Sequence, residues 1–279
     1  MWPVKRPQLD ALTTFKSCID RVRDTELVTR LNAASPTIQA ASNEYEAKAE
    51  DRRLNEVVPI DHVGGFVTRE EMISVYDSRM AAKGSPGRAI YDKLKMLPAG
   101  DRCPFCDQRN VSTLDHVLPK ADYPALTVAP LNLVGACIEC NFAKRKTAPT
   151  SRADVILHPY FDNISAARWL AADVIEGTPC AIVYRIERPE SWDDLTEARA
   201  RHQFGMLKLG ALYSSEAARE LSNIRLNLHD HLKAGGAAFV KAELMRQFVS
   251  RRANRLNSWQ TAFYDGAAQS EWFCNGGFL

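Results

Sequence analysis

The chain has 279 residues, of which 46% are hydrophobic and 25% are charged, and its formal net charge is +2. These values are typical of a globular protein with a sizeable core, and no global charge points to a polyanion as partner. No stretch approaches the ~18 consecutive apolar residues of a membrane span, and the first residues lack the apolar segment of a secretory signal. We therefore expect a cytoplasmic protein without a membrane partner.

Residues 1–100 are predicted to be mainly helical. Apolar residues recur at helix-like spacing over positions 9–31, and Pro36 is expected to end that run. Further along, Thr68 and Glu71 stand in the capping-box relation and predict the start of another helix. Nothing in this region forms a catalytic constellation.

Four of the seven cysteines form two C-x-x-C pairs: Cys103 with Cys106, and Cys137 with Cys140. Two such pairs in a reducing compartment have the spacing of a tetrahedral zinc site with four thiolate ligands. Four thiolates leave no open coordination position, so we expect this Zn²⁺ to be structural. The alternatives are a chance spacing or a redox-active pair.

The sequence between and after these pairs predicts four elements. β-Branched residues ahead of Asp115 and His116 predict a strand, which Pro119 ends. A loop follows, and the apolar run 131–134 predicts a second, short strand. Residues after the second pair predict a helix with Asn141 near its N-terminal end, where asparagine is a favoured cap. The predicted unit is strand, loop, short strand and helix.

Residues 150–279 are predicted to be mainly helical, with at least one strand. The clearest strand has the sequence PCAIVYRIERPE, and residues 192–212 are expected to form a long helix. Later apolar residues recur at helical intervals and are expected to face a core.

The central pattern resembles the HNH endonuclease motif, the ββα-metal or His-Me finger family, in its zinc-stapled form. It reads C-x2-C, L-D-H-x-x-P-K, L-N-L and C-x2-C-N-x-x-K, in the family's order, over about 45 of the 279 residues. The last position of the triad is Asn141 rather than histidine, a variant common in the family. The resemblance implies an α+β, predominantly α-helical protein, in which helical regions at 1–100 and 150–279 surround a small module at 101–149.

The motif carries the chemistry of phosphodiester hydrolysis. A neutral histidine can take a proton from water near pH 7, so His116 is the candidate general base. Asp115 and Asn141 offer oxygen donors, which suit Mg²⁺ or Mn²⁺, and the resemblance makes them the ligands of a catalytic ion. The resemblance also assigns Asn132 to bracing the loop by hydrogen bonds. Candidate contacts to a nucleic-acid backbone are Lys120, Lys144, Arg145 and Lys146.

The resemblance implies a metal-dependent endonuclease, with double-stranded DNA as the expected substrate. Proteins that resemble this chain are often effectors of restriction or phage-defence systems, frequently beside an ATPase. A regulatory ATPase or another defence protein is therefore a candidate partner, and the helical flanks could also bind DNA or form a homo-oligomer. Two alternatives stay open: a zinc-stabilised module that binds nucleic acid or protein without catalysis, and an HNH nuclease that acts on RNA.

Overall fold

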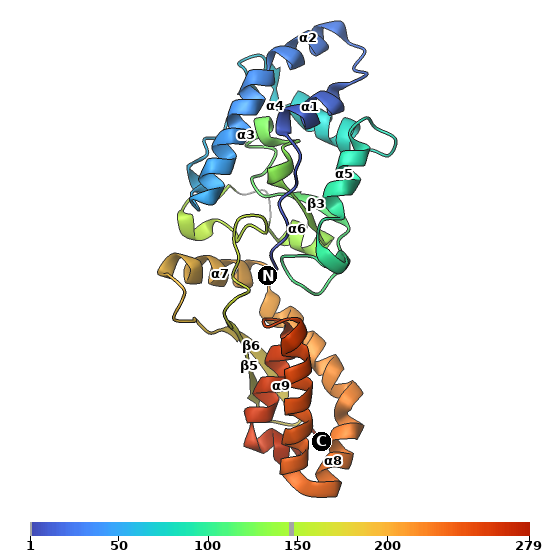
Figure 1. The fold of residues 1–279 in the computed structure, drawn as a ribbon, viewed down its shortest axis with the longest axis vertical. Coiled ribbons are helices and arrows are strands. Elements are labelled where there is room, and N and C mark those ends of the chain that lie inside the picture. The colour runs from blue at the N-terminus through green and yellow to red at the C-terminus, as the bar shows by residue number, and fades with distance from the viewer. Residues whose placement is uncertain (1, 145–147) are drawn as a thin grey trace. The chain divides into compact units, whose positions relative to one another are not determined.

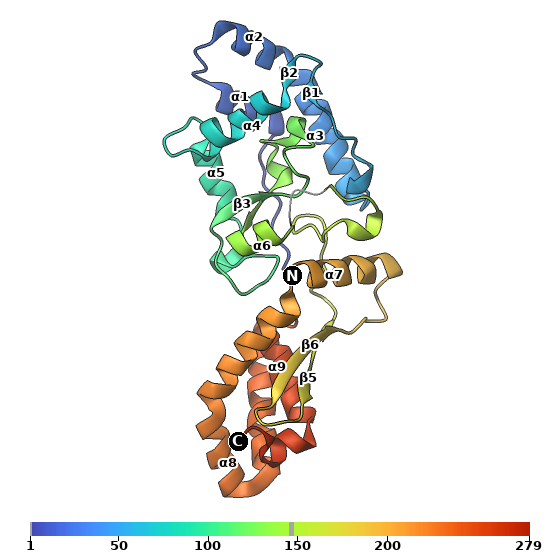
Figure 2. The same cartoon turned by 180° about the vertical axis from the view of Figure 1, so that it is seen from behind.

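The computed structural model describes residues 2–144 and 148–279. The chain divides into two compact units, Met1–Asn163 and Ile164–Leu279, which Figures 1 and 2 show from opposite sides. Helices dominate both units, and the described strands form two-stranded antiparallel sheets, so the predicted α+β, mainly helical fold class is confirmed. Among the described helices, none is long and apolar enough to cross a membrane.

The first unit is built from short helices around small sheets. Its elements, in chain order, are α1 (Ala11–Ile19), α2 (Thr25–Ala33), α3 (Ser35–Glu50), β1 (His62–Val63), β2 (Val67–Thr68), α4 (Arg69–Tyr76), α5 (Arg88–Lys95), β3 (Thr113–His116), β4 (Leu133–Ala136) and α6 (Ile138–Lys144). Short single turns, including η4 (Pro124–Leu126) and η5 (Pro130–Asn132), shape the loop between β3 and β4.

Side-chain caps fix several of the helix starts. Asp10 and Asp24 accept hydrogen bonds from backbone amides in the first turns of α1 and α2. The predicted capping box of Thr68 and Glu71 is confirmed at the start of α4. A helix ends just ahead of Pro36, as predicted, because α2 ends at Ala33. Pro36 itself lies in the first turn of α3, where a proline sacrifices no hydrogen bond within the helix.

One hydrophobic core joins the helices of the first unit to the β3–β4 hairpin. Leu114 of β3 and Leu133 of β4 belong to the same buried cluster as Phe15 of α1, Met72 of α4 and Leu94 of α5. Figures 1 and 2 show α3 and α5 on either side of β3. Residues 1–100 and the predicted module therefore form one unit, because the hairpin's apolar side chains complete the core of the helices.

The hairpin register places the candidate catalytic residues opposite apolar partners. Asp115 pairs with Val134 and His116 with Leu133 across the antiparallel ladder. Beside this ladder the end of α5 comes very close to β4, because a Cβ atom built on Gly135 would lie 2.9 Å from the carbonyl oxygen of Lys95. Glycine at position 135 therefore allows α5 to pack directly on the back of the hairpin.

The second unit is a β-hairpin covered by helices. Its elements are β5 (Leu170–Ile175), β6 (Ala181–Ile186), α7 (Asp194–Met206), α8 (Leu209–Asn254) and α9 (Trp259–Gln269). Exposed and buried residues alternate along β6, and its buried Tyr184 meets Tyr213 of α8 edge-on, with ring centroids 5.5 Å apart. The strand that the sequence predicts within PCAIVYRIERPE is β6.

Two breaks interrupt the helices that the sequence predicts in this unit. The predicted helix over 192–212 is divided at Lys208, whose backbone is left-handed with φ of 51°. The long helix α8 is itself kinked at Gly235 and Gly236, where Gly236 has φ of 65°. Such backbone angles favour glycine, so the two glycines let α8 fold back on itself.

Candidate metal centre and active site

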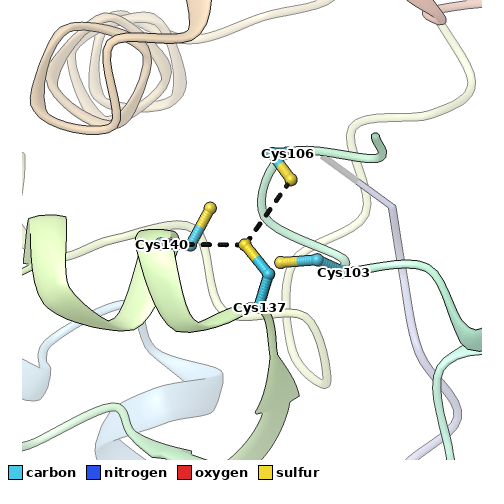
Figure 3. Close-up of side chains that lie close together, drawn as sticks. All are labelled: Cys103, Cys106, Cys137 and Cys140. Carbon is cyan, nitrogen blue, oxygen red and sulfur yellow. Dashed lines mark hydrogen bonds between the residues drawn. The ribbon is translucent and has the colours of Figure 1, made fainter. Parts of the chain in front are cut away.

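The four paired cysteines converge on one point in the first unit, as the spacing predicts. Cys103 and Cys106 lie on the loop ahead of β3, whereas Cys137 and Cys140 lie at the junction of β4 and α6. All four side chains are buried, and their sulfur atoms lie within 4.8 Å of one another. Figure 3 shows the four side chains pointing toward one another from these two segments. The cluster therefore joins the loop ahead of the hairpin to the helix that follows it.

Backbone hydrogen bonds shape each pair into a tight turn. In the first, the amide of Asp107 donates to the carbonyl of Cys103 (2.8 Å), and the amide of Arg109 donates to the sulfur of Cys106 (3.5 Å). In the second, the amide of Cys140 donates to the sulfur of Cys137 (3.4 Å). Amide donors aimed at sulfur stabilise thiolates, as expected around a bound cation.

The sulfur atoms also fit the size and charge of a zinc ion. Tetrahedral Zn–S bonds of ~2.3 Å imply sulfur–sulfur distances of roughly 3.8 Å, and the sulfurs of Cys106 and Cys137 are 3.9 Å apart. Hydrogen bonds with the other three thiols, first with Cys103, lower the pKa of Cys106. Hydrogen bonds with the other members of the cluster, again first with Cys103, raise the pKa of Cys140. Four thiols at this spacing cannot all ionise unless a cation offsets their charges, so the residues present fit structural Zn²⁺.

His116 is held in one orientation by a backbone carbonyl. Its Nε2 atom lies 2.8 Å from the carbonyl oxygen of Thr127, which can only accept, so Nε2 carries the proton and Nδ1 keeps the lone pair. The hydroxyl of Thr127 donates in turn to the carbonyl of Pro124 (2.6 Å) and fixes this turn of the loop. The ring of Tyr76 packs edge-on against the imidazole, with centroids 4.5 Å apart.

Burial keeps the imidazole neutral. Burial lowers the pKa of His116 to about 3, because the protein interior solvates the charged imidazolium less well than water does. The His116 imidazole is therefore uncharged throughout the neutral pH range, and the lone pair on Nδ1 stays unprotonated.

The carboxylate of Asp115 is buried beside His116 and has two differently placed oxygens. Oδ1 lies 3.1 Å from the ammonium of Lys144. Oδ2 has no hydrogen-bond partner among the described residues. Burial raises the pKa of Asp115 to about 6, and the charge of Lys144 opposes that rise. A buried carboxylate oxygen without a donor is costly to leave unpaired, and a divalent cation would satisfy it.

Lys144 reaches from α6 to the end of β3. Besides Asp115, its ammonium donates to the carbonyl of His116 and to that of Val117, the latter at 3.1 Å. The structure thus brings Lys144, Asp115 and His116 together. Contact between Lys144 and a nucleic-acid backbone stays a prediction.

Asn132 braces the loop that carries the carbonyl partner of His116. Its Oδ1 accepts from the amide of Leu118 (2.8 Å), and its Nδ2 donates to the carbonyls of Leu118 (3.0 Å) and Leu126 (3.2 Å). The loop between β3 and β4 is thus held by the fully buried amide of Asn132, which bonds to Leu118 at the start of the loop and to Leu126 in its middle. The loop turn that holds Thr127 is therefore anchored within a few residues on either side.

The sequence suggested that Asn141 caps the N-terminus of this helix. In the structure, Asn141 lies within α6. The helix begins at Ile138, and the backbone amide of Asn141 donates to the carbonyl of Cys137 (3.1 Å). The helix begins directly after Cys137, so Cys140 lies in its first turn and Asn141 comes after it. Asn141 sits one residue after the cluster and three before Lys144, on a helix that packs against β3.

The remaining predicted nucleic-acid contacts divide into two groups. Lys120 is described, and its ammonium pairs with Asp77 and lies 4.8 Å from the centroid of the Tyr76 ring. Arg145 and Lys146 lie outside the described residues.

Two contributors to the site escape sequence reasoning. The carbonyl of Thr127 holds His116, but a backbone acceptor leaves no trace in residue types. The other is His158, because Pro159 argues against a helix that would align it with Asp162 and residue types alone do not connect it with the motif. It is buried, and its Nε2 lies 2.9 Å from the hydroxyl of Tyr45 in α3 and 3.1 Å from the carbonyl of Leu131, beside Asn132.

Comparisons with known proteins find a relative of this chain. No family model matches the chain. No solved structure matches it either. The chain is similar to protein ea31 of Escherichia phage lambda, with 29% identity over 240 residues, which cover 80% of each of the two chains.

Proposed function

We propose that the first unit is a metal-dependent endonuclease of the HNH type, which hydrolyses phosphodiester bonds in DNA. The observation that carries the proposal is that Asp115 and His116, two consecutive residues of β3, have complementary properties. His116 is neutral and oriented by Thr127, and Asp115 beside it offers a buried, unpartnered oxygen. A proton acceptor adjacent to a candidate cation ligand is what hydrolysis of a phosphodiester requires.

His116 supplies the proton acceptor in this proposal. Because Nε2 donates to the Thr127 carbonyl, Nδ1 is the nitrogen that takes a proton from the attacking water. The Thr127 carbonyl then stabilises the imidazolium that forms, since it accepts a hydrogen bond from the other ring nitrogen. Asn132 keeps that carbonyl in place through its hydrogen bonds to the loop.

Asp115 and Asn141 are the residues that would hold the catalytic ion. Their carboxylate and amide oxygens are the donors that Mg²⁺ and Mn²⁺ prefer. When bound, such an ion supplies Lewis-acid stabilisation of the charge that develops on the leaving oxygen. Lys144 binds one oxygen of Asp115 and so orients the other one.

The cysteine cluster supports this site from outside it. Zinc bound to Cys103, Cys106, Cys137 and Cys140 would fix the start of α6 against the loop ahead of β3. Because Asn141 follows Cys140 directly, the cluster sets the position of this candidate ligand relative to Asp115.

A cleavage assay with several metals and two substrates tests the proposal. Zinc-loaded full-length protein is incubated with supercoiled plasmid or labelled RNA, in Mg²⁺, Mn²⁺ or excess chelator. We expect nicking of the plasmid that needs Mg²⁺ or Mn²⁺ and that Asp115→Asn reduces by at least about 100-fold. Cleavage of RNA alone would assign the nuclease to RNA. Absence of cleavage on both substrates with every metal would instead favour a binding module without catalysis.

A further inference from the structure

Helix α6 has a buried face and an exposed apolar face. Successive residues of a helix turn by about 100°, so residues four apart share a face. Cys140 and Lys144 share the inward face, where one joins the cysteine cluster and the other reaches Asp115. Ile138 and Phe142 share the outward face, and they are 45% and 75% exposed. Phe142 is the most exposed aromatic residue among the large hydrophobic residues exposed in the described part of the chain, and Ile138 extends its apolar surface along the helix.

The exposed ring belongs to the residue that follows the candidate metal ligand Asn141. Phe142 follows Asn141 directly, and about 100° of helix rotation places Asn141 between the exposed apolar face and the Lys144 side of α6. A polymer whose backbone reaches Asp115 and Asn141 therefore passes within one residue of Phe142. Glu139 is the acidic residue on this part of the helix, and Arg109 lies 3.6 Å from it, so its repulsion of a polyanion is partly offset.

We propose that Phe142, flanked by Ile138, contacts the bases of DNA bound at the Asp115–His116 site. The ring acts as an apolar wedge against the face of a base next to the cleaved phosphodiester. The inference rests on the proposed function, because it takes the DNA backbone to lie at that site. Aromatic side chains stack on every base, so this contact adds affinity without sequence preference.

The chemistry of the patch favours nucleic acid over a protein partner. Two side chains on one short helix are far less than the ~800 Å² per partner that a stable protein interface buries. A single aromatic ring is enough to stack on a base. The neighbouring residue Asn141 is also proposed to hold the ion that binds a phosphodiester, and a protein partner offers no phosphodiester to such an ion.

Photocrosslinking tests the contact without depending on catalysis. The full-length, zinc-loaded protein carries His116→Ala to prevent cleavage and p-benzoylphenylalanine in place of Phe142. The matched control carries the same crosslinker in place of Met96, which is 76% exposed in the same unit. We expect a crosslink to a labelled mixed-sequence duplex from position 142 and only background from position 96. Crosslinking from position 142 to protein, or no more DNA crosslinking than from position 96, would overturn the proposal.

Binding affinities provide the second measurement. Phe142→Ala should weaken the binding of the duplex about tenfold, whereas Phe142→Trp should retain it, because the larger ring still stacks. Met96→Ala should leave the Kd unchanged. Equal Kd values for wild type and Phe142→Ala would overturn the contact even if the wild type cleaves DNA. A crosslink from position 142, together with a wild-type protein that cleaves neither DNA nor RNA with any metal, would leave the contact standing and refute the nuclease proposal.

Discussion

The ammonium of Lys144 lies 3.1 Å from Oδ1 of Asp115, and the two side chains are only 10% and 4% exposed. This pair connects the end of α6 to β3 in a place where water solvates both charges only weakly. It also determines which carboxylate oxygen is left for another ligand, because Oδ2 has no hydrogen-bond partner among the described residues. Lys144 is therefore better described as an orienting partner of Asp115 than as a surface cation.

Breaking this pair should be costly. Lys144→Met leaves the Asp115 charge buried without its partner, so we expect a loss of about 3 kcal/mol in the free energy of unfolding, measured by urea denaturation. Lys120→Met is the matched control. Lys120 pairs with Asp77 at side-chain exposures of 25% and 53%, so its loss should cost about 1 kcal/mol or less.

A double mutant separates the charge effect from lost packing. Adding Asp115→Asn to Lys144→Met removes the uncompensated charge, so the double mutant should recover at least about 1 kcal/mol relative to Lys144→Met alone. Strictly additive losses would show that the pair contributes no coupling energy, and the orienting role of Lys144 would then be wrong.

The cysteine cluster should bind one zinc ion per chain and stabilise the first unit. Cys140→Ser should abolish the zinc measured by elemental analysis and lower the thermal unfolding temperature, because metal binding contributes directly to the folding free energy. Excess chelator should destabilise the wild type in the same way.

Cys180→Ser is the control for this prediction, since Cys180 lies in the second unit and outside the cluster. It should keep the zinc content and the unfolding temperature of wild type. A Cys140→Ser protein that retains full zinc would mean that the four sulfurs do not form the binding site.

Asn132 should matter for stability far more than its short side chain suggests. Asn132→Ala removes the amide that makes three buried hydrogen bonds and leaves loop groups unpaired, so it should cost about 2–4 kcal/mol of unfolding free energy. Asn32→Ala serves for comparison, because the exposed Asn32 amide donates only to the carbonyl of Val28 in its own helix. That change should stay within about 0.5 kcal/mol of wild type. Equal costs for the two variants would contradict the bracing role.

Local sequence signals predicted much of the first unit. Paired cysteines, the capping box of Thr68 and Glu71, and the β-branched residues before Asp115 each act over a few residues, so they indicate structure without knowledge of the fold. Pro36 correctly indicated a helix boundary, although it lies in the first turn of α3 and not at the end of α2. Lys208 carries no such signal, because lysine does not itself predict the left-handed backbone that divides α7 from α8.

The contacts that orient the candidate site depend on distant parts of the chain. The carbonyl of Thr127 reaches His116 only because Asn132 folds the loop, and His158 meets Tyr45 across 113 positions of sequence. Residue types constrain such backbone and long-range contacts weakly, so the sequence could name His116 without naming what holds it. The contact of Lys144 with Asp115 was missed for the same reason.

The most direct test of the central claim compares plasmid nicking by the wild-type and His116→Ala proteins. Both are zinc-loaded, full-length and matched in thermal stability, and both are assayed at the same Mn²⁺ concentration. If the neutral imidazole held by Thr127 takes the proton from water, His116→Ala should nick at least about 100-fold more slowly. Equal nicking rates for the two proteins would contradict that role and the active site built around it.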